Sequence, residues 1–190
     1  MRRRKKQTVI QGLLILLLLC GWVSARFNMV FSPLVAMQSG EKLNHYGPSQ
    51  EILLEYKKDG VVHMVGKVDD RTLSVYEAHR DFGFFWYGYP SGPCAIKEGE
   101  HVWARYQETL LGLTDLKEAE TVVCILQTNK TELEAGQPRI YEMSVDEQGF
   151  FYVPYEDCPN LRDWYINQIQ IFDANGILLD EIIDYEVEPR

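Results

Sequence analysis

Residues 51–68 read EILLEYKKDGVVHMVGKV, and this stretch decides the fold predicted for the chain. Apolar and polar residues alternate before the central Asp59-Gly60, so Ile52, Leu54 and Tyr56 share one face of an extended strand. Asp-Gly between two apolar runs suits a two-residue hairpin turn, because both turn residues adopt positive φ. The stretch therefore predicts an antiparallel β-hairpin.

The rest of the chain repeats this pattern. Two more hairpin turns are predicted at residues 146–149 and 173–176, between apolar runs. Residues 121–127 are almost wholly apolar, which predicts a central strand covered on both faces. In the last strand we expect Ile177, Leu179 and Ile183 to face inward, with carboxylates on the wet side. The sequence contains few helix signals after residue 30. The predicted fold is all-β, an antiparallel sandwich or small barrel, preceded by one N-terminal hydrophobic helix.

The N-terminal segment carries an export signal. A basic run at residues 2–6 precedes an uncharged stretch at residues 7–25 that is rich in leucine and isoleucine. Its 19 residues match one membrane crossing, and Trp22 stands where an interfacial anchor belongs. We therefore expect a single-pass anchor through residues 7–25, with the C-terminal body outside the cell membrane. The alternative is secretion after cleavage at Ala25.

Charge divides the chain into a basic head and an acidic body. The 190 residues include 19 basic and 28 acidic ones, and six basic residues but no acid fall in the first 26 positions. The remainder carries a formal charge of −15. Nucleic acid would be repelled by such a body, and it is excluded as a partner. The expected organisation is a head at residues 1–25, a linker or leading arm at 26–48, and one β-rich domain at 49–190.

No motif in the sequence points to catalysis or to a cofactor. The four histidines are His45, His63, His79 and His101, and none stands at metal-ligand spacing to another histidine or to a cysteine. No nucleophile elbow, zinc-protease motif or phosphate-binding loop is present. Asp173-Ala174-Asn175-Gly176 is interpreted as a hairpin turn rather than a calcium loop. No catalytic, metal or cofactor residue is therefore predicted.

Six aromatic residues crowd into the nine positions of residues 82–90, FGFFWYGYP. One interpretation is an aromatic platform for a sugar or an apolar peptide. The favoured one is a core strand, because both of its faces are aromatic and both cannot easily be wet. Tyr87, Tyr89 and Trp103 are the aromatic residues that we expect to remain partly exposed and ligand-facing.

The cysteines suggest one candidate disulfide. Cys124 lies inside an apolar run and is expected to behave as a small buried hydrophobe. Cys94 and Cys158 each neighbour a proline in a predicted loop, and these two could pair in an oxidising compartment. The alternative is that all the thiols stay reduced.

Three stretches resemble small membrane-anchored proteins of Gram-positive, Firmicutes-type bacteria: Tyr46-Gly47-Pro48-Ser49 continuing through residues 51–56, Ser74-Val75-Tyr76, and residues 81–86. That group shares a basic start, one hydrophobic segment and a β-rich exterior domain without an assigned function. The resemblance implies a cell-surface location and no active-site residue.

Two functions remain open. The first is a non-enzymatic extracytoplasmic β-domain that binds a protein or a cell-envelope component. The second is a small exported hydrolase whose catalytic site is assembled from distant residues.

Overall fold

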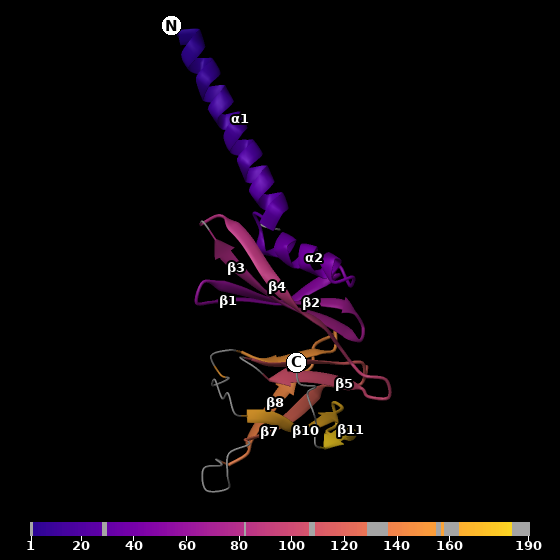
Figure 1. Cartoon of the computed structure of the whole chain (residues 1–190). Coiled ribbons are helices and arrows are strands. Elements are labelled where there is room, and N and C mark those ends of the chain that lie inside the picture. The colour runs from indigo at the N-terminus through magenta and orange to yellow at the C-terminus, as the bar shows by residue number, and fades with distance from the viewer. Residues whose placement is uncertain are drawn as a thin grey trace. The chain divides into compact units, whose positions relative to one another are not determined.

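The computed structural model describes residues 2–27, 30–81, 83–106, 109–128, 137–154, 157 and 164–183. The chain is mostly β, in antiparallel sheets with two helices, which confirms the predicted β-rich class (Figure 1). It divides into two compact units. Unit 1 comprises Met1–Val68 and Ser74–Pro93, and unit 2 comprises Asp69–Leu73 and Cys94–Arg190.

Unit 1 holds both helices and one four-stranded sheet of order β1-β2-β3-β4. Its elements are α1 (Arg2–Phe27), α2 (Pro33–Leu43), β1 (Glu51–Lys58), β2 (Val61–Asp69), β3 (Thr72–Asp81) and β4 (Phe85–Ala95). The residues of β2, β3 and β4 that lie within 69–73 or after residue 93 belong to unit 2. Asp59 and Gly60 have positive φ values of 50° and 84°, so the turn predicted between β1 and β2 is confirmed.

Helix α2 packs against this sheet through one face. Ala36 and Met37 are buried in a core cluster with the sheet residues Val62, Met64, Tyr76 and Ala78. Pro33 stands at the start of the helix, where its missing N–H costs nothing. The prediction of a linker or leading arm is therefore corrected for residues 33–43. These residues form a helix that completes the core of unit 1.

Helix α1 has a different environment. Its large apolar side chains between Val9 and Trp22 are 54–69% exposed. No helix in the described part of the chain combines the length and the apolar character that crossing a membrane requires.

A buried carboxylate fastens the end of α2 to the start of β1. Glu41 is fully buried, and it accepts a hydrogen bond from the backbone N–H of Ser49 at 3.0 Å and another from the Ser49 hydroxyl. Nearby, the Tyr46 hydroxyl lies 3.4 Å from the hydroxyl of buried Ser74. Burial, followed by the proximity of Tyr46 and Glu41, raises the pKa of Tyr76 to about 12. The hydrogen-bonding groups of this cluster have partners within the protein, and we interpret the cluster as a structural one.

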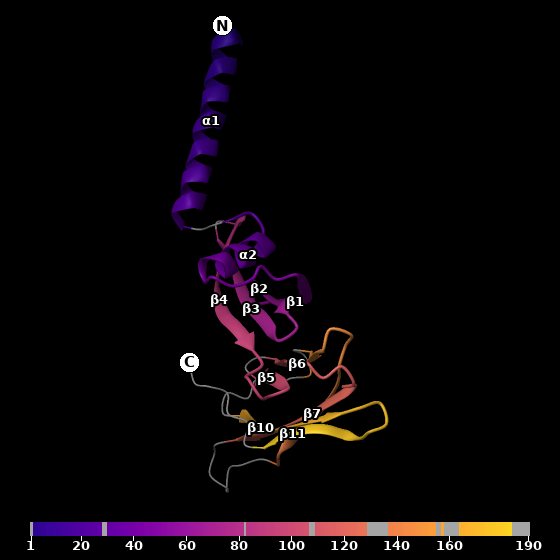
Figure 2. The same cartoon turned by 90° about the vertical axis from the view of Figure 1, so that its right-hand side faces the viewer.

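Unit 2 contains two antiparallel sheets. The three-stranded sheet has order β5-β6-β9, with β5 (Val102–Tyr106), β6 (Leu110–Thr114) and β9 (Phe150–Val153). The four-stranded sheet has order β11-β10-β7-β8, with β7 (Thr121–Thr128), β8 (Arg139–Ser144), β10 (Trp164–Phe172) and β11 (Leu178–Ile183). Figure 2 shows β5 and β6 as one layer, with β7, β10 and β11 as the other.

The two sheets of unit 2 bury one apolar cluster between them. Val102, Ala104 and Leu110 come from the smaller sheet, and Val122, Cys124 and Ile169 from the larger one. Gly112 in β6 lies against the ring of Phe151 and the backbone oxygen of Trp103, so a Cβ there would collide with both. This two-layer packing is the sandwich form of the predicted fold class.

Two predictions about strand faces are wrong. Strand β7 is central, but only Val122, Cys124 and Leu126 are fully buried, and the alternate residues are half-exposed. In β11, Ile182 packs against the core, while Leu179 and Ile183 are 38% and 62% exposed. The reason is register: Ile182 lies opposite the core residue Ile169.

Replacing Glu41 with alanine should lower the free energy of unfolding by about 2 kcal/mol, because two donors of Ser49 lose their buried acceptor. Urea titration followed by circular dichroism measures this. Glu118→Ala is the matched control, since Glu118 is exposed in a turn. Equal stability of the two variants would contradict the structural role of Glu41.

Candidate interaction surface

Two of the three aromatic residues expected to face a ligand have described side chains, one in each unit. Tyr87 in unit 1 is half-buried and stacks on His79, with ring centroids 5.6 Å apart. Trp103 in unit 2 is half-buried on β5, opposite Leu113 of β6. The side chain of Tyr89 lies outside the described residues. Their role as ligand contacts stays a prediction.

The aromatic run of residues 82–90 splits between core and surface. Phe85 is buried and Trp86 and Tyr87 are half-buried, as the core interpretation requires. Phe84, in the turn before β4, is instead 49% exposed. The guanidinium of Arg80 lies 5.7 Å from the ring centre of Trp86, a cation–π distance.

The cysteines are partly described. Cys124 is fully buried in the core of unit 2, and burial raises the pKa of its thiol to about 12. Cys94 lies at the end of β4, whereas Cys158 falls outside the described residues. The Cys94–Cys158 pairing therefore stays a prediction.

The hairpin turn after β10 uses its carboxylate internally. Asp173 Oδ1 accepts hydrogen bonds from the backbone N–H groups of Ile177 at 2.8 Å and Asn175 at 2.9 Å. The bond from Ile177 contributes most to lowering the pKa of Asp173. The turn interpretation is confirmed, and the described residues contain no cluster of side chains able to hold a metal ion.

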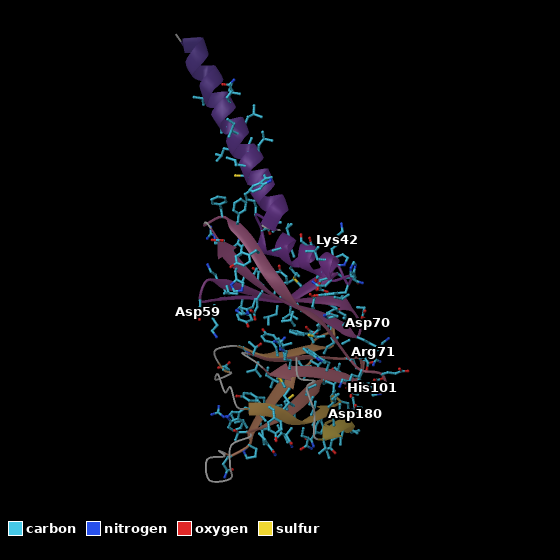
Figure 3. All side chains as sticks on the ribbon, viewed as in Figure 1. Lys42, Asp59, Asp70, Arg71, His101 and Asp180 are labelled. Carbon is cyan, nitrogen blue, oxygen red and sulfur yellow. The ribbon has the colours of Figure 1, made fainter. Side chains whose placement is uncertain are left out.

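One charged cluster bears on the hydrolase hypothesis. His101 Nδ1 lies 2.9 Å from Asp115 Oδ1, and Arg71 donates to Asp115 Oδ2 at 2.5 Å (Figure 3). Arg71 also donates to the carbonyl oxygens of Lys97 and Glu100. Within the described residues, the His101 ring is hydrogen-bonded to no serine, threonine or cysteine. The arrangement lacks a described nucleophile. It acts as a clasp that holds segment 69–73 to the rest of unit 2.

The outer face of the four-stranded sheet carries a continuous row of side chains. Strand register places Ile140 opposite Ile125, Ile125 opposite Gln168, and Gln168 opposite Ile183. The two terminal isoleucines, on the edge strands β8 and β11, are 66% and 62% exposed. We call these four residues the isoleucine row. It spans three inter-strand spacings, about 14 Å.

Carboxylates flank the isoleucine row. The next row runs Glu142, Val123, Gln170 and Glu181, with glutamates at both ends. Glu181 Oε1 accepts hydrogen bonds of 2.7 Å from the side-chain amides of Gln168 and Gln170, which fixes it across the sheet. Three isoleucines on one sheet face beside negative charges suit a partner that presents apolar and basic side chains together.

Both edges of this sheet are open among the described residues, since β8 and β11 are its terminal strands. Leu178 and Leu179 are 46% and 38% exposed along β11. An edge strand with apolar neighbours offers unpaired backbone groups to another chain. Sequence reasoning missed this surface because it assigned residues 121–127 to a strand covered on both sides.

Comparison of the chain with protein-family models, curated proteins and solved structures finds no match. The resemblance to small anchored proteins of Gram-positive bacteria stays a prediction, and the surface is interpreted from its own geometry.

Cys124 should resist alkylation in the folded chain, because a pKa of about 12 leaves about one thiolate in ten thousand at pH 8. Iodoacetamide labelling followed by peptide mapping measures this, with a denatured sample as the control. Native labelling at the rate of an exposed thiol would refute the burial. Maps prepared without reduction test the Cys94–Cys158 pairing in the same sample.

Proposed function

We propose that the chain is an interaction module, anchored in the cell membrane through α1, that binds a protein outside the membrane with the isoleucine row. The observation that carries the binding role is that row, with exposed isoleucines at both ends and carboxylates beside it. Exposed apolar side chains that gather on one face of a protein mark interaction sites more often than single exposed ones do.

The anchoring role is supported by α1. Its large apolar side chains from residue 9 to residue 22 surround the helix and are 54–69% exposed in the described part of the chain. Water is an unfavourable environment for such a helix, while a bilayer is a favourable one. The basic residues 2–6 favour retention of the N-terminus on the cytoplasmic side. Cleavage before Arg26, which would release the body, is the alternative.

The partner is proposed to be a protein because the surface is one face of a sheet whose terminal strands among the described residues, β8 and β11, are edge strands. Apolar contact along the row provides affinity, and Glu142 and Glu181 favour a partner with basic side chains at the same spacing. The exported hydrolase is not adopted, because the one histidine–aspartate pair described here is held by Arg71 and lacks a nucleophile.

Anchoring predicts that the chain sediments with membranes and that protease added to intact cells degrades units 1 and 2. Immunoblotting against the C-terminus measures this, with a cytoplasmic protein as the protection control. Full protection of the body would refute the orientation. A mature N-terminus at Arg26 would show release in place of anchoring.

The binding role predicts one partner for both ends of the isoleucine row. A photo-crosslinking phenylalanine analogue is placed at Ile140 or at Ile183 of the full chain in cells, with Lys117 as an exposed control position. Both row positions should yield an adduct to the same protein. Val123→Lys should abolish it, because a charge at the centre of the face opposes the apolar contact. Adducts independent of position would contradict the proposal.

A further inference from the structure

Exposed large apolar side chains of unit 1 outside α1 gather mainly at one end. Phe31, Leu34, Val35 and Phe84 are 65%, 40%, 45% and 49% exposed. We call these four residues the apolar end. Leu43, at the other end of α2, is the remaining residue of this kind among the described part of unit 1.

Ring contacts join two of the four residues of the apolar end to the start of β4. The rings of Phe31 and Phe84 flank buried Phe85, at centroid distances of 5.1 and 4.6 Å. Val30 and Trp86 exchange two backbone hydrogen bonds of 2.8 and 2.6 Å. The chain entering from α1 is thus fastened to the first residues of β4, and the apolar end is a fixed part of unit 1.

The sheet places its two hairpin turns at this same end. In the order β1-β2-β3-β4, antiparallel neighbours bring the β1–β2 and β3–β4 turns to one side (Figure 1). Asp59 marks that side of unit 1 in Figure 3, and Lys42 marks the far end of α2. Lys57, Lys58 and Arg80 precede these turns, against Asp59 and Asp81. These five residues carry a net formal charge of +1, within a body of strongly negative charge.

The connection to α1 is short. From Phe27, the last residue of α1, to Val30 is three residues, at most about 11 Å of extended chain. The uncharged stretch of α1 ends at Ala25. Each headgroup layer of a bilayer is about 5–8 Å thick. A helix whose Ala25 lies at the edge of the hydrocarbon core therefore keeps Val30 within about 14 Å of that edge, in the headgroup layer or just beyond it.

We infer that the apolar end of unit 1 inserts into the outer interface of the bilayer that holds α1. Phe31 and Phe84 supply aromatic rings of the kind that favours the interface, and Arg80 keeps its charge in the headgroup layer. Lys57, Lys58 and Arg80 bring basic side chains to this end, which lessens the repulsion between the acidic body and anionic lipids. The inference rests on the proposed anchoring and adds a fixed orientation of unit 1 on the membrane.

The test places a benzophenone-bearing phenylalanine analogue in the full chain, reconstituted in nanodiscs of phosphatidylcholine with or without phosphatidylglycerol. The positions are Phe31 and Phe84, with Leu16 of α1 as the anchoring control. Gln50 is the background position, since it is exposed at the opposite end of the β1–β2 hairpin. Circular dichroism checks the fold of each variant, and mass spectrometry detects lipid adducts.

Lipid adducts at positions 31 and 84, several-fold above those at position 50 and in both lipid mixtures, are the expected result. Adducts at position 16 with background yields at 31 and 84 would refute the inference and leave the anchoring intact. Background yields at position 16 would refute both. Adducts from 31 or 84 to another protein, or to a second copy of this chain, would assign the apolar end to a protein contact instead.

Discussion

The alternation of side chains in β7 is the constraint on which unit 2 depends. Val122, Cys124 and Leu126 must all point to the smaller sheet, because together they form the middle of the only core cluster described in that unit. Once they do, Val123 and Ile125 are committed to the opposite face. A one-residue slip would exchange the two sets and expose the thiol. The candidate interaction surface is thus the direct counterpart of the core.

Two of the three hairpins predicted from turn chemistry are formed, but the one predicted at residues 146–149 is wrong, because β8 pairs with β7 and β9 pairs with β6 in the other sheet. Asp59-Gly60 and the turn at residues 173–176 specify hairpins locally, whatever the rest of the chain does. Helix α2 could not be read in the same way, because Pro33 and Gly40 each resemble chain breakers. In the structure Pro33 opens the helix and Gly40 lies buried on its packed face. Tertiary packing against the sheet therefore outweighs the weak local preference of this segment.

The candidate surface was beyond the reach of sequence patterns for a related reason. When valine and isoleucine occur on both faces of a strand, the sequence indicates burial of both faces equally. Which face is exposed to solvent depends on whether another layer of the protein covers it. His101 and Asp115 illustrate the same limit, since fourteen residues separate a pair that meets through strand pairing of β5 with β6. In contrast, the basic start and the apolar run of α1 can be identified from the sequence without tertiary information.

The clasp at Arg71 has a consequence for synthesis. A ribosome makes the chain from its N-terminus, so the sheet and helix of unit 1 are complete once residue 93 has emerged. Segment 69–73 emerges with them, but Arg71 must wait 44 further residues for Asp115. Its other two acceptors, the carbonyl oxygens of Lys97 and Glu100, also come later in the chain than residue 93. Segment 69–73 is therefore the first part of unit 2 to be made, and it precedes the segment after residue 93 that supplies its partners.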